Sequence, residues 1–383
     1  MKQRTYKATG INLKAIHMGE SDRMVTVLTK EKGLVRAIAP GARKHKSRLA
    51  GRSGLFVVNN ILFTKGKSID KLIQAETQRS FPGLSKDLAK LTASQYLAEI
   101  ALAQALSDQP QEELFYLLVE HLGRLEAATS ANVLACLAQA TFHLLALAGV
   151  APEVFRCCLS RVPLEADLSN SDWQVGFSVS SGGAIHTDEI ERIERDRLQE
   201  VKQRIASQMP ASKQSAEHHV AEAKAPYNRP DNNGPNAEAQ PRRVQHKWPV
   251  GLEAKVSKEV ARNLGIVTHL SAAELSLMQQ LSKPELLLTP STLTASKSSL
   301  TVENEDASTH FSPQSGTIKG AAIATSMGSG AESGPHANSR PHSMWRNIEK
   351  ALRHYAQYQF DRPIRSAALI DTCFTPIADA SRV

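Results

Sequence analysis

The sequence has few of the features that mark membrane, secreted or disulfide-bonded proteins. It has no apolar run near the about 18 residues that a membrane helix needs, and its best stretch, residues 142–151, is interrupted by His143 and Gly149. The N-terminal residues carry charge, and no apolar segment with a cleavage site follows them, so we expect no secretory signal. Four cysteines in 383 residues are too few for a disulfide scaffold. A cytoplasmic protein without a membrane partner is expected.

Aromatic residues are scarce as well, at 5%, whereas hydrophobic residues make up 41% and charged residues 22%. These fractions exclude a chain that is disordered throughout. A length of 383 residues is enough for two or three domains.

The formal net charge of +8 is unevenly distributed along the chain. Residues 1–80 contain 17 Lys and Arg against 5 Asp and Glu, a net charge of +12, so the other 303 residues carry 29 against 33, a net charge of −4. Such a basic segment favours a polyanionic partner, and without a basic amphipathic helix nucleic acid is favoured over a membrane. The nucleic-acid-binding surface is therefore expected in the first 80 residues.

The pattern of residues 1–80 is that of a small β-barrel. Residues 24–28 and 34–39 are joined by Lys-Glu-Lys-Gly, which predicts a hairpin with Gly33 at positive φ. Three further strands are predicted at residues 7–17, 55–64 and 71–77. Five short strands with positive charge favour an OB-fold, and an SH3-like barrel fits the pattern almost as well.

After residue 83 the apolar spacing becomes helical. Helices are predicted at residues 84–103, 114–125, 133–148, 187–205, 252–264, 271–281 and 344–360. The expected architecture is α+β and multidomain: an OB-fold domain at 1–80, a helical domain at 81–150 and 191–288, a small irregular module at 151–190, and a C-terminal helix and tail at 344–383. Residues 206–249 and 289–343 have few large apolar side chains, so we expect them to be disordered inserts.

The densest positive charge lies in Arg-Lys-His-Lys-Ser-Arg-Leu-Ala-Gly-Arg at residues 43–52, which contains no carboxylate. Pro40-Gly41 predicts that this segment is an exposed loop after a hairpin strand, where it can follow phosphates. The candidate DNA-binding residues are Arg36, Arg43, Lys44, Lys46, Arg48, Arg52, Lys65 and Lys67. Phe56 and Phe63 are candidate base-stacking rings, although a strand Phe more often belongs to the core.

Motifs for catalysis or for a cofactor are missing. Gly66-Lys67-Ser68 lacks the earlier glycine of a phosphate-binding loop, because Ile61 stands there. No Cys-x-x-Cys pair is present, so a metal site built from Cys157 or Cys158 with His186 and an acidic residue is less favoured than a buried structural Cys pair. We expect no metal, no other cofactor and no catalytic residue.

Several stretches resemble the RecO family of bacterial recombination and DNA-repair mediators of the RecF pathway. The resemblance is most specific in the first 80 residues, with Glu-Ser-Asp-Arg at 20–23 and Lys-Gly-Leu-Val-Arg-Ala-Ile-Ala-Pro-Gly-Ala-Arg-Lys at 32–44. Later similarities are Leu-Ala-Gly-Val-Ala-Pro-Glu at 147–153, Phe-Ser-Val-Ser-Ser-Gly-Gly at 177–183, and Tyr-x-x-x-Gln-Phe-x-Arg-Pro-Ile-Arg-Ser-Ala at 355–367.

The resemblance implies a function without bond cleavage. A protein of this family binds single- and double-stranded DNA, anneals complementary strands, works with RecR and single-strand-binding protein, and helps to load RecA, so it acts in the cytoplasm at the nucleoid. Many members carry two Cys-x-x-Cys pairs in the small module, where this chain has Cys157, Ser160, His186 and Glu189. A degenerate zinc-finger-like module without zinc is therefore expected.

Two other classes of function fit the same charge pattern. A metal-dependent nuclease could use the basic barrel to hold its substrate, but the five acidic residues of the barrel are scattered: Glu20, Asp22, Glu31, Asp70 and Glu76. An RNA-binding OB module is the other alternative.

Overall fold

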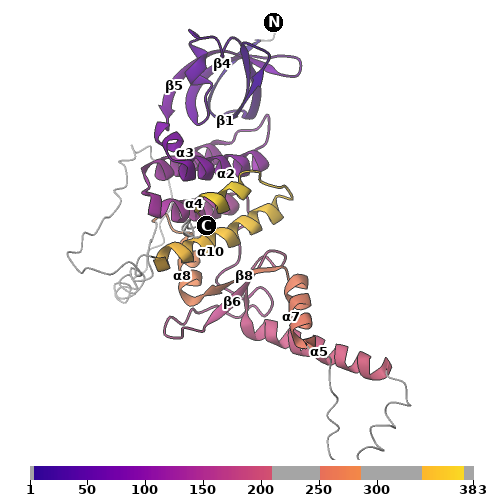
Figure 1. The fold of residues 1–383 in the computed structure, drawn as a ribbon. Helices are drawn as coiled ribbons and strands as arrows, with labels where there is room; N and C mark the ends of the chain where they lie inside the picture. The colour runs from indigo at the N-terminus through magenta and orange to yellow at the C-terminus, as the bar shows by residue number, and fades with distance from the viewer. Residues whose placement is uncertain (1–3, 209–250, 286–338, 375–383) are drawn as a thin grey trace, which may run out of the picture.

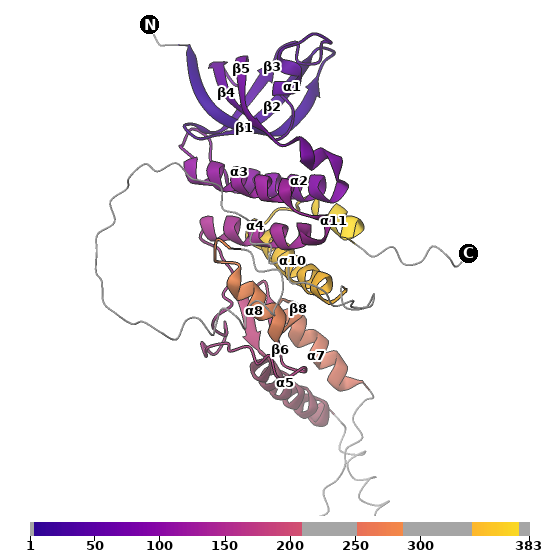
Figure 2. The same ribbon diagram turned by 90° about the vertical axis from the view of Figure 1, so that its left-hand side faces the viewer.

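The computed structural model describes residues 4–208, 251–285 and 339–374. Figure 1 and Figure 2 show a β-barrel at one end of the molecule, stacked helices in the middle, and a small sheet with a projecting pair of helices at the other end.

The N-terminal residues form a closed barrel with the strand order β1-β2-β3-β5-β4. The strands are β1 (Thr5–Met18), β2 (Asp22–Thr29), β3 (Gly33–Ala39), β4 (Val57–Thr64) and β5 (Asp70–Ser80). Neighbouring strands are antiparallel except β3 and β5, which pair in parallel. All five predicted strands are present, and this strand order identifies the OB-fold rather than an SH3-like barrel.

Alternating residues of the strands fill the barrel. The buried interior side chains are Ala8, Val25, Val27, Val35, Ala37, Ile61, Phe63, Leu72 and Ala75. Because side chains of a strand point alternately to its two faces, the residues between them lie on the outside of the barrel. The Phe63 ring is stacked on Tyr6, with 5.2 Å between the ring centroids.

The β2–β3 hairpin joins the barrel to the helical domain. Gly33 has φ 63°, as predicted, and a Cβ placed there would lie 2.1 Å from the carbonyl oxygen of Leu106. The N–H of Leu34 donates to that same carbonyl at 2.9 Å, and the N–H of Gln111 donates to the carbonyl of Lys30 at 2.8 Å. Only glycine allows this close approach, so the hairpin holds the two parts in one orientation.

The helical domain begins with η1 (Pro82–Lys86), α2 (Leu88–Gln104), α3 (Glu112–Ala127), η2 (Ser130–Asn132) and α4 (Val133–Leu147). The Asp87 side chain accepts the N–H groups of Ala89 and Lys90, which fixes the start of α2. Two C-terminal helices complete the layer: α10 (Ser339–Gln359) packs along α4, and α11 (Ala367–Phe374) packs against α2. The predicted helices are confirmed, but α11 was not expected.

One described segment, Ser130–Leu147, is long and apolar enough to cross a membrane by length and composition alone. The expectation that no stretch approaches this length, with residues 142–151 as the best candidate, is therefore wrong. In the structure 67% of it is buried, and α4 contacts α2, α3 and α10. Its apolar character therefore reflects its place at the centre of the helical core.

The expectation of an irregular module at 151–190 is wrong in part, because this region contributes to a three-stranded sheet. The sheet has the order β7-β6-β8, with β6 (Gln174–Ser178), β7 (Gly183–His186) and β8 (Ile266–Ser271). The strand β8 was not expected. After β8 comes α8 (Ala272–Gln280), whose predicted capping box between Ser271 and Glu274 is confirmed.

A pair of helices, α5 (Thr187–Gln208) and α7 (Leu252–Asn263), projects from this sheet as an arm (Figure 1). Arg197 bridges to Glu259 at 2.8 Å, which ties the two helices together. The first predicted insert starts too early, because residues 206–208 belong to α5. The second ends too late, because residues 339–343 belong to α10. Their remaining parts lie outside the described residues.

Candidate nucleic-acid interface

The basic loop, residues 40–48, is a series of turns fastened to the β1–β2 hairpin. The N–H of Gly41 donates to Asp22 Oδ1 at 2.8 Å, and the N–H of Arg43 donates to the carbonyl of Ser21 at 2.9 Å. The hydrogen bond from Gly41 holds the pKa of Asp22 below its usual value, so this carboxylate stays ionised as an anchor. The loop is therefore ordered by the barrel while Lys44, Lys46 and Arg48 remain exposed.

Two of the predicted DNA-binding arginines also donate hydrogen bonds to backbone carbonyls of the barrel. Arg43 Nη1 donates to the carbonyl of Gly19 at 2.7 Å, although the side chain is exposed. Arg52, at the end of α1 (Leu49–Arg52), is half-buried and donates to the carbonyl of Ala75 at 2.7 Å. Each guanidinium keeps further N–H groups for another acceptor, because arginine has five.

Arg36 lies on the outer face of the barrel rather than in the loop. It pairs across the sheet with Thr26, and the parallel pairing of Ala37 with Asp70 places the turn at residues 65–69 next to it. Lys65 and Lys67 are exposed in that turn. The register therefore brings Arg36 close to the β4–β5 turn.

The same outer face carries residues that the sequence analysis missed. Ile16, Met24 and Ile38 lie side by side across β1, β2 and β3, and Lys71 pairs with Ile38 on the next strand. Ile16 is 41% exposed. Strand alternation could have revealed this apolar row between basic residues, because every second residue of a barrel strand faces outward.

Phe56 and Phe63 are core residues, which confirms the favoured interpretation, and the alternative of a base-stacking role for either ring is wrong. Their exposed fractions are 4% and 0%, so neither ring can stack on a base. Phe63 belongs to the barrel interior, and Phe56 packs into the core shared with the helical domain. No Phe, Tyr or Trp ring is exposed on the described part of the barrel, residues 4–80, whereas the His17 and His45 side chains are exposed, so contacts to nucleic acid there depend on charge, imidazole and aliphatic side chains.

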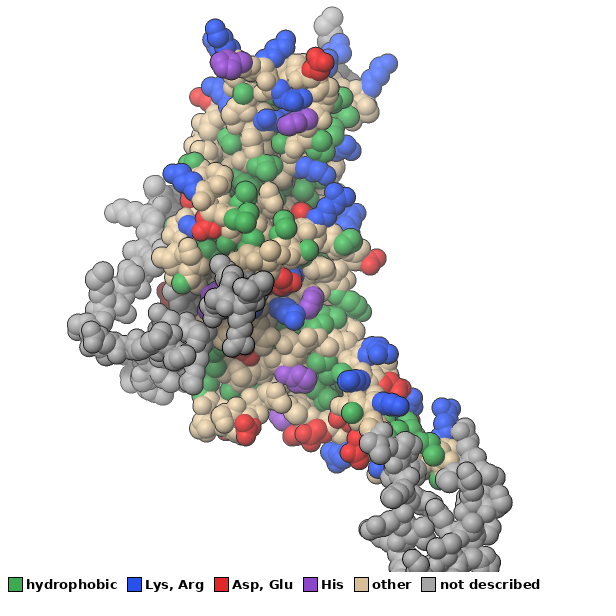
Figure 3. All heavy atoms as spheres, in the orientation of Figure 1, with side chains coloured by type: hydrophobic (Ala, Val, Ile, Leu, Met, Phe, Trp, Pro, Cys, Tyr) green, Lys and Arg blue, Asp and Glu red, His purple; other side chains and the backbone are tan. Residues whose placement is uncertain are grey.

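Figure 3 shows several Lys and Arg side chains at the barrel end of the molecule, and others along the helical domain and on the arm. Two acidic residues in this region bind neighbouring backbone: Asp22 holds Gly41, and Asp70 Oδ1 accepts the N–H of Gly66 at 2.9 Å. Each carboxylate therefore fixes the backbone of a segment that carries basic residues: Asp22 the basic loop, and Asp70 the β4–β5 turn. Among residues 4–208, 251–285 and 339–374, no three His, Cys, Asp or Glu side chains are grouped to hold a metal ion.

The residues at the positions where the resemblance implies zinc ligands do not fit a tetrahedral zinc site. Cys157 is fully buried, and its Sγ accepts the N–H of His186 at 3.3 Å. Burial opposes ionisation of this thiol, but hydrogen bonds from His186 and Ser160 outweigh it and lower the pKa of Cys157. Glu189 instead forms an ion pair with Arg192 at 2.7 Å. With one thiol among the four positions, the zinc-finger-like character expected for this module is not supported.

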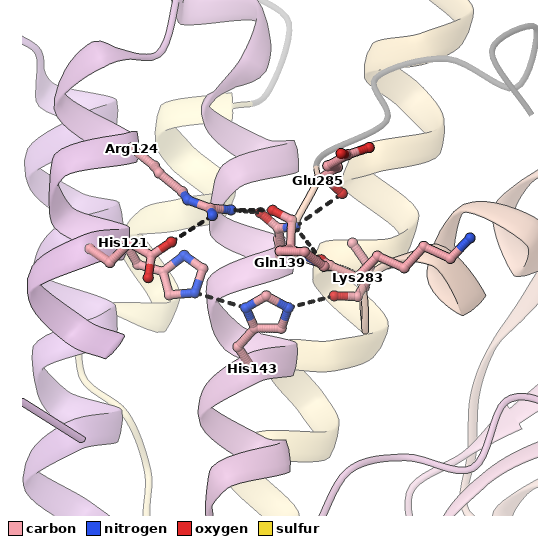
Figure 4. A network of polar contacts seen from close by, with 9 residues as sticks. His121, Arg124, Gln139, His143, Lys283 and Glu285 are labelled. Carbon is pink, nitrogen blue, oxygen red and sulfur yellow. Dashed lines mark hydrogen bonds and ion pairs between the residues drawn. The ribbon is translucent and has the colours of Figure 1, made fainter. Parts of the chain in front are cut away.

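A histidine pair between α3 and α4 is structural (Figure 4). His121 Nε2 lies 3.0 Å from His143 Nδ1, and His143 Nε2 lies 2.7 Å from the carbonyl oxygen of Leu281. Burial lowers the pKa of His121 to about 3, so the ring is neutral. Arg124 and Gln139 bind the carbonyls of Pro284 and Lys283 beside it, and the whole network fastens the segment after α8 to α3 and α4.

Arg353, a basic residue of α10, is not available for a DNA contact. It is 4% exposed and forms an ion pair with Glu349 at 3.1 Å and hydrogen bonds with Asp371. Arg362 and Arg365 remain exposed nearby.

Fold and surface together define an OB-fold nucleic-acid-binding protein with a helical second domain. Two family models match the chain: "Recombination protein O N terminal" over residues 1–81 and "Recombination protein O C terminal" over residues 85–195. The chain is 44% identical to DNA repair protein RecO of Nostoc punctiforme over 381 residues, which covers 99% of each chain. It is 42% and 41% identical to the proteins of the same name from Nostoc sp. and Acaryochloris marina, again over 99% of each chain.

The chain therefore belongs to the RecO family of DNA repair and recombination proteins.

Proposed function

We propose that this chain binds single- and double-stranded DNA through the barrel, anneals complementary strands, and helps to load RecA on DNA coated with single-strand-binding protein. The observation that carries the proposal is the ordered basic loop with Lys44, Lys46 and Arg48 exposed, beside the outer face that holds Arg36. Arg43, Arg52, Lys65 and Lys67 extend this basic surface. Annealing needs neutralisation of two phosphate backbones, and a surface of lysine and arginine supplies it.

Contacts of this kind read phosphates rather than base edges, so we expect weak sequence preference. The aliphatic row of Ile16, Met24 and Ile38 offers bases an apolar surface without an aromatic stack. Weak contact to the bases leaves them free to pair with a complementary strand. This property suits a mediator rather than a sequence-specific binder.

The proposal includes RecR and single-strand-binding protein as partners, action in the cytoplasm at the nucleoid, and no enzymatic activity. It also includes the division into a DNA-binding barrel at 1–80 and a helical domain that continues after the module at 151–190. Family membership supports a role in DNA repair, because the relatives are named DNA repair proteins.

Annealing of complementary oligonucleotides coated with single-strand-binding protein tests the function. The purified chain should accelerate annealing without magnesium, and the variant Lys44→Ala/Lys46→Ala/Arg48→Ala should lose most of the acceleration. Magnesium-dependent cleavage of either strand would support the nuclease alternative. Tighter binding to RNA than to single-stranded DNA in a competition assay would support the RNA-binding alternative.

A further inference from the structure

A cavity of about 570 Å³ opens on the helical domain, away from the basic loop. Its walls come from the ends of four helices and the α2–α3 connection: Gln104, Pro110, Gln111, Glu112, Glu113, Leu114, Leu147, Ala148 and Phe360. It lies in the part of the sequence whose net charge is negative. None of these residues belongs to the proposed DNA surface.

The cavity is electrostatically negative for two reasons. Glu112 and Glu113 lie on its wall in the first turn of α3, and Lys30 neutralises only Glu112, at 3.3 Å. No ion pair of Glu113 is found within the described residues. In addition, α2, α4 and α10 all end at the cavity, and each helix C-terminus carries about half a negative charge. The single N-terminus, that of α3, offsets only one of them.

The lining also offers apolar contacts and one free donor. Leu147 is 38% exposed, and Phe360 is half-buried beside it. The Nε2 atom of Gln104 is buried and has no hydrogen-bond partner among the described residues. A buried amide donor without a partner is costly, and the carbonyl of a bound peptide would satisfy it once the Gln104 side chain turns into the cavity.

We propose that this cavity docks a segment of a partner protein that carries a lysine or arginine next to an apolar side chain. The cation would face Glu113 and the three helix C-termini, the apolar side chain would cover Leu147 and Phe360, and a backbone carbonyl would accept from Gln104. Nucleic acid is disfavoured here, because its phosphates would meet the same negative charges. The helical domain would then recruit protein while the barrel holds DNA.

The test uses the full chain and two fluorescein-labelled peptides, Gly-Ser-Leu-Lys-Leu-Ser-Gly and the same peptide with Glu in place of Lys, followed by fluorescence polarisation. We expect saturable binding of the lysine peptide, at least tenfold tighter than that of the glutamate peptide. Glu113→Lys should weaken it at least tenfold, whereas Glu165→Lys, an equal charge change at an exposed position of the small module, should not.

Leu147→Ser should weaken binding as well, whereas Leu168→Ser, another exposed leucine, should leave it unchanged. Circular dichroism melts of each variant establish that the fold is retained. Equal binding of the two peptides, no saturable binding, or equal effects of Glu113→Lys and Glu165→Lys would overturn the proposal. Displacement of the peptide by a single-stranded oligonucleotide would overturn it too. No DNA is needed for binding, so failure of this assay is distinct from failure of the proposed annealing function.

Discussion

The salt dependence of DNA binding offers the sharpest test of the basic loop. Besides Arg43, which is exposed but holds the carbonyl of Gly19, six exposed candidates belong to the surface: Arg36, Lys44, Lys46, Arg48, Lys65 and Lys67. If each neutralises one phosphate of a single strand, the slope of log affinity against log salt is about −4, from about 0.7 per contact. Affinity should then fall about 300-fold between 50 and 200 mM salt, by the same relation.

The variant Lys44→Ala/Lys46→Ala/Arg48→Ala removes three of these contacts and leaves Arg43 to hold Gly19. Its slope should be about −2, and its affinity should fall only about 20-fold over the same salt range. Stability should change by less than about 0.5 kcal/mol, because the three side chains are exposed and none holds the loop in place.

The assay is a titration of labelled oligonucleotides at four or more salt concentrations. The control, Lys255→Ala/Lys258→Ala/Arg262→Ala, removes three exposed charges from α7 at the opposite end of the molecule. A slope that stays near −4 in the loop variant, or that falls equally in the control, would refute the assignment of the DNA surface.

Three further predictions concern stability and metal content. Gly33→Ala should lower the free energy of unfolding by at least about 2 kcal/mol in urea denaturation, because its Cβ would lie against the Leu106 carbonyl. Gly19 has a similar φ of 60°, but a Cβ there would meet no atom within 4 Å, so Gly19→Ala should lower the free energy of unfolding by only about 1 kcal/mol. Equal losses for the two variants would contradict the close contact between Gly33 and the Leu106 carbonyl. Burial raises the pKa of Glu349 to about 7, so the folded state holds this proton where the unfolded state has lost it, and stability falls as pH rises from about 5 to 8. Glu349→Gln should therefore gain about 1–3 kcal/mol relative to the native chain between those pH values, and a constant difference would exclude a raised pKa. Elemental analysis should find no stoichiometric zinc; one zinc per chain that is lost in Cys157→Ser would show that the module binds metal after all.

The barrel was predictable because its signals are local. Alternating apolar residues, the glycine turn at Gly33 and the basic segment after Pro40 are each contained within a few residues. The capping box at Ser271 is local too. The strand β8 escaped prediction because its partner β6 lies about 90 residues earlier in the chain, and such pairing depends on tertiary contacts that no short window contains.

The positive charge of the candidate site was predictable from the sequence, but the hydrogen bonds and burial of its individual side chains were not. A run of basic residues without carboxylates identifies an exposed loop, but it does not reveal that Arg43 and Arg52 also bind backbone carbonyls. The burial of Phe56 depends on how the barrel meets the helical domain, which is a property of the assembled fold. Arg353 has Glu349 at the i,i+4 spacing of a helix, so that pair is local, but the burial of Arg353 and its contact with Asp371 depend on packing.

The arm has a consequence for how much the chain can change in length. Near its outer end, Lys202 of α5 lies 4.0 Å from Glu253 of α7, so residues 209–250 connect two points that the helices already hold together. The closure entropy of a loop between two fixed points costs only about 0.6 kcal/mol more for each doubling of its length. The outer end of the arm is therefore a permissive place for insertion, and a fluorescent protein or affinity tag placed there would leave the barrel and the helical core undisturbed.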